Sequence, residues 1–187
     1  MKSVVADQIG QLEAVRRALP TKRHVGGPAI EVHLDELRLS GLLPTKLVSE
    51  YEHRLSTIGT LRGRRAAIGA AKELLESVLK ASLKVLGEPT PSKKTDLPTL
   101  AKLTRFAIAQ RGAIAPTSSG ANHLERYLGA STSFLAEWRN EFGTGHGRSS
   151  APNLERRHAQ VAIDTATSMS RLIVSTLDDL KLLPPTP

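Results

Sequence analysis

Apolar residues recur along this chain mainly at spacings of three and four, and runs that alternate between apolar and polar residues are almost absent. This spacing places side chains on one face of an α-helix, because the helix has about 3.6 residues per turn. The pattern therefore predicts an all-α fold. We expect the helices to bury their apolar faces against one another in an antiparallel bundle.

The strongest helical pattern covers residues 64–86, where apolar residues return to the same face turn after turn. Gly87, followed closely by two prolines, predicts the end of this helix. Glu76 and Lys80 lie one turn apart and are expected to pair on the exposed face. The predicted buried stripe consists of Ile68, Ala71, Leu75, Val78, Leu79, Leu83 and Leu86.

Six further helices are expected, each bounded by glycine, proline or a residue that can cap a helix. They cover residues 5–19, 30–39, 44–58, 97–110, 122–139 and 154–183. Asp96 stands directly before Leu97-Pro98 and is expected to cap the helix that follows. The last helix is expected to turn inward Ala159, Ile163, Ala166, Met169, Ile173, Leu177 and Leu180.

Residues 1–50 differ from the rest of the chain because two loops interrupt their helical pattern. One is a Gly- and Pro-containing loop at residues 26–28, and the other is a turn at residues 41–44. We therefore expect residues 1–50 to form an N-terminal helical extension next to the main domain.

The chain is basic: 26 Lys and Arg residues outnumber 18 Asp and Glu residues, which gives a formal net charge of +8. Such an excess favours polyanionic partners, since Lys and Arg contact phosphates and release counterions. Nucleic acid is therefore the leading candidate partner, although a basic surface also serves solubility alone. Only 3% of the residues are aromatic, which argues against a surface that stacks many unpaired bases.

The absence of cysteine excludes disulfide bonds, thiolate zinc sites and cysteine nucleophiles. The N-terminal residues reach Asp7 before any apolar run long enough for a signal peptide, and no stretch has the apolar length of a membrane span. We therefore expect a cytoplasmic protein that does not bind a membrane.

One segment, residues 138–148, carries the side chains best suited to chemistry. A predicted helix ends near Trp138-Arg139, and three glycines between residues 143 and 147 then break it and bring His146 back toward Arg139. Arginine supplies a permanent planar charge whose donors fit phosphate oxygens, and histidine gives and takes protons near neutral pH. The pair therefore suits phosphodiester chemistry.

A metal-independent ribonuclease needs a base for the ribose 2′-OH, an acid for the leaving 5′-oxygen and positive charge on the phosphoryl oxygens. His146 and Arg139 can fill these roles. One histidine does not easily perform both proton transfers, so we expect a homodimer that places two copies of the segment in one cleft. The alternative is that the glycines only connect two helices and that Arg139 pairs with Glu137 or Glu141.

Four blocks of the sequence resemble, in their residues and their order, the abortive infection protein C-terminal family of bacteria. The blocks are residues 67–80, 96–100, 135–148 and 157–159. The resemblance covers residues 51–183. That family is similar to the HEPN superfamily of helical toxins and ribonucleases, whose motif is Arg, usually a polar residue, and then His after four to six intervening residues.

Arg139, Asn140 and His146 match this motif, with six residues between the Arg and the His. The resemblance implies a HEPN-like bundle and a metal-independent endoribonuclease toxin of phage defence, which uses no cofactor and leaves a 2′,3′-cyclic phosphate and a 5′-OH. It also implies that His146 is the general acid or base, that Arg139 stabilises the phosphoryl charge and that Asn140 orients the site. RNA, a second copy of the chain and an antitoxin protein are the candidate partners. Some HEPN-like proteins are thought to be non-catalytic binding modules, and this alternative stays open.

Lys72, Glu73 and Arg148 are secondary candidates for contacts with the substrate. Lys72 and Arg148 can hold phosphates, and Glu73 can orient His146 if its helix packs against the loop. A solvated helix surface is the plainer interpretation of each.

Two arginine clusters are candidate contacts for an RNA backbone, although solvated helix ends are again the plainer interpretation: Arg62, Arg64 and Arg65, and Arg156 and Arg157 with His158. Glu31 and Asp35 flank His33 and make a weak metal-site hypothesis. Two other classes of function stay open. One is a helix-turn-helix DNA-binding protein, although no helix is dense in Arg, Asn or Gln, and the other is a module that recruits a partner toxin or antitoxin.

Overall fold

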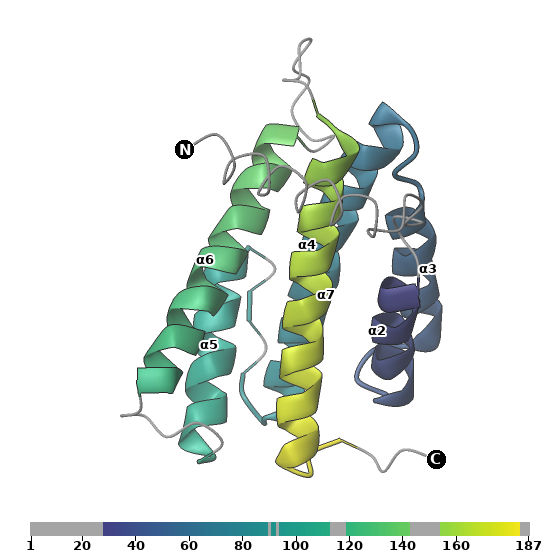
Figure 1. Cartoon of the computed structure of the whole chain (residues 1–187). Coiled ribbons are helices and arrows are strands. Elements are labelled where there is room, and N and C mark those ends of the chain that lie inside the picture. Colours follow the sequence, from purple (N-terminus) through teal and green to yellow (C-terminus); the bar gives the residue numbers. More distant parts are fainter. Residues whose placement is uncertain (1–27, 90, 93, 113–118, 143–153, 184–187) are drawn as a thin grey trace, which may run out of the picture.

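The computed structural model of the chain describes residues 28–89, 91–92, 94–112, 119–142 and 154–183. These residues form six helices (Figure 1): α2 (Pro28–Leu39), α3 (Thr45–Ser56), α4 (Leu61–Val85), α5 (Leu97–Gln110), α6 (Ser119–Phe142) and α7 (Arg156–Asp179). No strand occurs within these ranges, and the predicted all-α fold is confirmed. The helix expected over residues 5–19 lies outside the described residues.

Two long helices, α4 and α7, form the centre of the bundle and run in the same direction (Figure 1). The α2–α3 pair packs on one side of them and the α5–α6 pair on the other. Successive helices run antiparallel, as the sequence predicts, with one exception. The connection from α4 to α5 carries the chain back along the bundle, so that both α5 and α7 run in the direction of α4 (Figure 1).

The core lies mainly between the two central helices. All seven residues of the stripe predicted on α4 are buried, none of them more than 2% exposed. The inward face predicted on α7 is buried from Ala159 to Leu177, and small alanine side chains on both helices let the two axes approach closely. Leu180, also expected to point inward, is only partly buried, because α7 ends at Asp179 and Leu180 occupies the cap position.

The start of α4 lies three residues before the predicted start, and Gly63 explains the difference. The hydroxyl of Thr60 accepts a hydrogen bond from the backbone N–H of Gly63 at 3.0 Å and caps the helix. The carbonyl oxygen of Thr57 lies so close to Gly63 that a Cβ there would be 1.6 Å away from it. Gly63 is therefore required by a close backbone contact inside the first helical turn.

The caps predicted around the α4–α5 connection are confirmed. Gly87, which follows the C-cap Leu86, adopts a φ of +72°, the left-handed conformation that glycine adopts most easily. The carboxylate of Asp96 accepts a hydrogen bond from the backbone N–H of Thr99 at 2.7 Å and caps α5. Local sequence therefore fixes both ends of this connection.

The N-terminal part of the described chain shares the common core. Leu34 and Leu37 of α2 are 0% and 2% exposed, and α2 packs on α7. The expected division at residue 50 falls inside α3, which packs on α4, and a separate extension over residues 1–50 stays a prediction. None of the described helices is long and apolar enough to cross a membrane.

Candidate functional site

Arg139 and Asn140 lie in the last turn of α6, which continues three residues past its predicted end and finishes at Phe142. Arg139 is partly buried and Asn140 is exposed. The partial negative charge at the C-terminal end of a helix favours a cation there. Within the described residues, Arg139 forms no ion pair with Glu137 or Glu141, so neither nearby carboxylate neutralises its charge.

Three aromatic rings run along the last turns of α6 and form an aromatic ladder: Phe134, Trp138 and Phe142. Their spacing of four residues places them on one face of the helix. The ring centroids are 4.4 Å apart from Phe134 to Trp138 and 5.4 Å apart from Trp138 to Phe142. All three rings are partly buried against the core. The ladder therefore fixes the turn that carries Arg139.

A histidine from the first turn of α7, His158, packs against two rings of the ladder. The ring of His158 lies 5.6 Å from Trp138 at an interplanar angle of 83°, and 6.4 Å from Phe142 at 14°. Its Nδ1 accepts a hydrogen bond from the backbone N–H of Glu155 at 3.0 Å. Because Nδ1 is the acceptor, a neutral ring carries its proton on Nε2. Helices α6 and α7 are thus joined by ring contacts directly beside Arg139.

Sequence analysis placed His158 in a basic run and in one of the blocks that carry the family resemblance, but did not connect it to the motif. The usable signal was the spacing of the aromatic ladder, because the chain has only one Trp and three Phe. Concentrating Trp138 and two of these Phe on one helical face marks a packing surface. Which side chain packs against that surface was not readable, because His158 lies twenty residues beyond Trp138.

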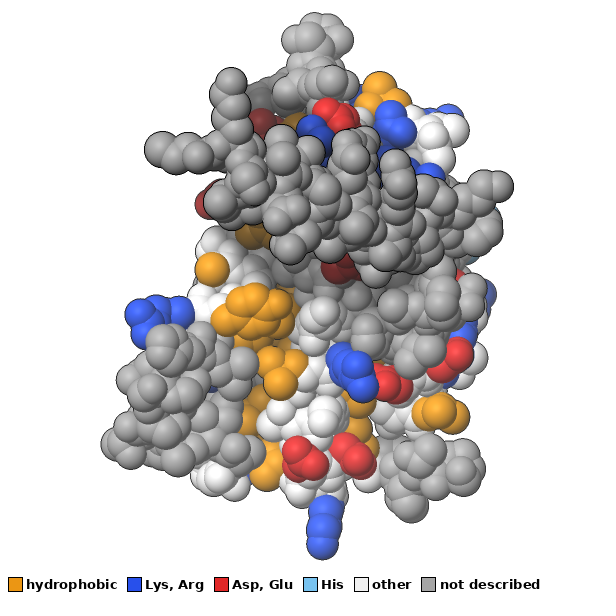
Figure 2. Space-filling view, viewed as in Figure 1, with side chains coloured by type: hydrophobic (Ala, Val, Ile, Leu, Met, Phe, Trp, Pro, Cys, Tyr) orange, Lys and Arg blue, Asp and Glu red, His pale blue; other side chains and the backbone are white. Residues whose placement is uncertain are grey.

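Positive charge gathers where α6 ends and where α4 and α7 begin, at the upper end of the bundle in Figure 1. We call this surface the basic end: Arg62, Arg64 and Arg65 on α4, Arg139 on α6, and Arg156 and Arg157 on α7. Figure 2 shows Lys and Arg side chains at the upper end of the visible face. Carboxylates offset part of this charge; Arg157, for example, pairs with Glu155 at 2.9 Å.

The three arginines of α4 differ from those of α7. Arg62 is exposed, whereas Arg64 and Arg65 are partly buried. The Nε atoms of Arg64 and Arg65 are buried and have no hydrogen-bond partner within the described part of the chain. Neither side chain forms an ion pair there.

Glu73, one of the secondary candidates, is engaged with α3. Its carboxylate accepts a hydrogen bond from Arg54 Nη1 at 2.7 Å. Its backbone carbonyl accepts one from the hydroxyl of Tyr51 at 3.2 Å. Glu73 therefore faces α3, whereas Arg139 lies on α6, on the other side of α4 (Figure 1).

Lys72, the second of these candidates, forms an ion pair with Glu76, which also accepts a hydrogen bond from Lys80 at 2.6 Å. The predicted pair of Glu76 and Lys80 is thereby confirmed. His146 and Arg148 belong to residues 143–153, outside the described residues, and the roles expected of these side chains stay predictions.

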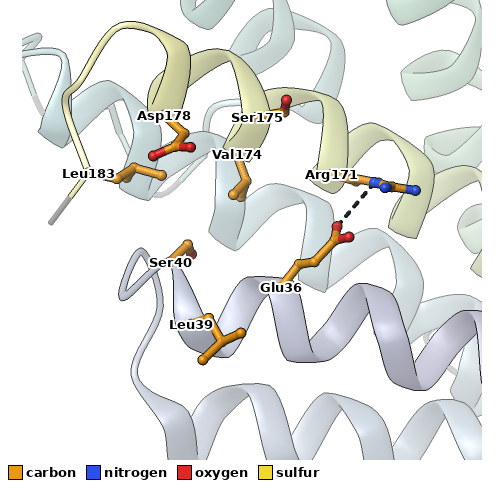
Figure 3. A pocket seen from close by; sticks show the side chains of 8 residues that line it. All are labelled: Glu36, Leu39, Ser40, Arg171, Val174, Ser175, Asp178 and Leu183. Carbon is orange, nitrogen blue, oxygen red and sulfur yellow. Dashed lines mark ion pairs between the residues drawn. The ribbon is translucent and has the colours of Figure 1, made fainter. Parts of the chain in front are cut away.

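Among the side chains that the structure describes, no group of three His, Asp or Glu residues is arranged to hold a metal ion. The side chains of Glu31 and His33 lie outside that part, and the metal-site hypothesis for them stays a prediction. A hollow of about 270 Å³ lies between α2 and α7 (Figure 3), which is small for a drug-sized ligand. The Arg171–Glu36 ion pair, 3.1 Å from Nε to Oε2, lies on one side of it, and Leu39 and Leu183 lie on another. None of the motif residues lines this hollow.

The fold and the site together define an all-helical bundle protein with a cationic motif at one end. A family model described as the HEPN-like domain Abi_C matches residues 45–177, which run from the start of α3 almost to the end of α7. The chain belongs to this family of HEPN-like domains, whose role is in abortive infection. No curated protein and no solved structure matches the chain.

Proposed function

We propose that this protein is a metal-independent endoribonuclease of the toxin type that acts in bacterial phage defence. The observation that carries the proposal is the state of Arg139. It lies in a turn fixed by the aromatic ladder, has no ion pair with its neighbouring carboxylates, and shares the basic end with five other arginines. This arrangement supports contact with the phosphates of RNA.

The reaction that these side chains support is attack of a ribose 2′-oxygen on the adjacent phosphorus. A bond forms between the 2′-oxygen and phosphorus, the bond from phosphorus to the 5′-oxygen breaks, and a 2′,3′-cyclic phosphate and a 5′-OH result. His146 takes the proton from the 2′-OH or donates one to the leaving 5′-oxygen. Arg139 stabilises the charge on the phosphoryl oxygens, and Asn140 orients the group.

The two proton transfers favour a two-fold homodimer. One His146 acts as the base and the His146 of the second copy acts as the acid, so that each ring needs only one protonation state at a time. A two-fold axis brings identical surfaces together and therefore makes a composite cleft from one sequence segment. Arg148 is a further proposed phosphate contact in this cleft.

The alternative is a non-catalytic module that binds nucleic acid or a partner protein such as an antitoxin. The basic end favours this alternative as much as it favours an enzyme, because phosphate contacts alone supply binding without chemistry. The two functions differ in what His146 does.

The test uses labelled RNA in excess EDTA, incubated with wild type, His146→Ala, Arg139→Ala and His53→Ala. His53 is an exposed histidine near the end of α3 and serves as the matched control. We expect wild type and His53→Ala to leave cyclic phosphate ends. We expect His146→Ala to lose about 10²–10⁴-fold in rate while it stays folded and still binds RNA.

Equal cleavage by wild type and His146→Ala would remove His146 from the mechanism. Absence of cleavage by every variant, together with RNA binding that weakens steeply with salt, would replace the enzyme by the binding module. Sedimentation of the same samples reports whether the wild type is a dimer.

A further inference from the structure

His158 stands out among the polar side chains near the motif because several groups fix its ring at once. Its Nδ1 accepts the Glu155 N–H, its plane stands edge-on to Trp138, and it lies nearly parallel to Phe142. An apolar side chain would supply the packing alone. Histidine adds an acceptor for a backbone donor at the start of α7, where the first N–H groups of a helix have no partner within the helix.

The position of the His158 ring matters because the two rings that it contacts flank Arg139 and Asn140 in the sequence of α6. Trp138 and Phe142, which His158 contacts, are placed on either side of Arg139 and Asn140 in the last turn of α6. A helix end frays easily unless tertiary contacts hold it. Here Trp138 and Phe142 pack against the core, and His158 of α7 adds ring contacts to both of them, so we expect a change at His158 to reach Arg139 through the ladder.

We infer that His158 is a positioning residue of the proposed nuclease: it locks the Arg139-bearing turn of α6 onto the first turn of α7. This inference rests on the proposed function for its effect on cleavage. The lock consists of two parts, the hydrogen bond to Nδ1 and the ring contacts with Trp138 and Phe142. The hydrogen bond requires an Nδ1 without a proton, because a protonated Nδ1 cannot accept the Glu155 N–H.

Two substitutions separate the parts of the lock. His158→Phe keeps an aromatic ring against Trp138 and removes the acceptor. His158→Asn keeps a short side-chain acceptor near the position of Nδ1 and removes the ring. His53→Asn is the matched control, because His53 is exposed and forms no contact with the ladder. Emission from Trp138, the only tryptophan in the chain, reports whether the ladder stays packed in each variant.

The decisive measurement is a double-mutant cycle with Arg139→Ala, using cleavage rates of folded protein far below the unfolding temperature. We expect His158→Phe and His158→Asn each to lower kcat by about 10- to 100-fold with little change in KM, as loss of supporting contacts around a site does. In the Arg139→Ala background the same substitutions should have almost no further effect, because the group that they position is gone.

An equal loss of kcat with and without Arg139 would show that His158 acts independently of Arg139 and would overturn the inference. A wild-type kcat in both His158→Phe and His158→Asn would overturn it as well.

If the wild type binds RNA but does not cut it, the proposed nuclease fails. The cycle is then read from affinity for 2′-O-methyl RNA, which cannot be cleaved by 2′-OH attack. His158→Phe should weaken that binding only when Arg139 is present. If the wild type neither cuts nor binds RNA, both proposals fall.

Discussion

At the scale of single residues, two glycines of α4 have opposite surroundings. A Cβ on Gly63 would lie 1.6 Å from the carbonyl oxygen of Thr57 and 2.7 Å from its carbonyl carbon. Both atoms belong to the backbone and cannot move aside as a flexible side chain would. Gly69, two turns further along the helix, has nothing within 4 Å of the position that a Cβ would take.

We therefore predict opposite signs for the same substitution. Gly63→Ala should lower the free energy of unfolding by about 2–3 kcal/mol, because the first turn of α4 must shift away from Thr57. Gly69→Ala should raise it by about 0.5–1 kcal/mol, because alanine loses less conformational freedom than glycine on entering a helix. Urea unfolding of both variants measures the difference. If Gly63→Ala left the free energy of unfolding unchanged, the close contact with Thr57 would not be part of the folded state.

At the scale of one element, α4 carries a line of alternating charge. Glu76 lies one turn from Lys72 and one turn from Lys80, and both ammonium groups donate to its carboxylate. Burial alone would raise the pKa of Glu76, but the hydrogen bonds and charges of the two lysines outweigh it and hold the pKa below its ordinary value of 4.5. The charged form of Glu76 therefore favours the folded state.

A carboxyl whose pKa is lower in the folded state stabilises the protein above its unfolded pKa, and this contribution disappears as the pH falls through the folded pKa. We predict that Glu76→Gln costs about 0.5 kcal/mol at neutral pH, a value typical of helical ion pairs one turn apart. The difference from wild type should shrink as the pH falls below 4.5. Thermal unfolding across this pH range, with the exposed Glu50→Gln of α3 as control, measures it. If the stability difference between Glu76→Gln and wild type did not change with pH, the charge of Glu76 would not be its cause.

At the scale of the whole molecule, the bundle extends beyond the region that the family shares. The family match begins at residue 45, yet α2, which precedes it, contributes Leu34 and Leu37 to the common core. A helix that buries such side chains against α7 should unfold together with the rest of the bundle.

Leu34→Ala should therefore lower the stability of the entire protein by about 2–5 kcal/mol in a single transition, because it leaves a cavity in the core. Leu39→Ala, on the same helix but 54% exposed, should change the free energy of unfolding by less than about 0.5 kcal/mol. Calorimetry and helical circular dichroism, compared in both variants, check this. A separate early transition for α2 with an unchanged main transition would instead favour an independent extension.

The features that sequence determined are those set within a few residues. The buried stripe of α4, the inward face of α7, the Asp96 cap and the glycine end of α4 all depend on neighbours within one or two turns. Helical period and capping chemistry act at this range, so the sequence predicts them without knowledge of the fold. The same range placed Arg139 and Asn140 close to the end of a helix.

Only the tertiary structure decided which of these elements meet. It set α4 parallel to α7, placed Gly63 against Thr57 inside a helix, turned Glu73 toward Arg54 and brought His158 onto Trp138. These contacts depend on which faces pack together and on the path of the α4–α5 connection. Helical period carries no information about either, because the same apolar stripe can pack against several partners.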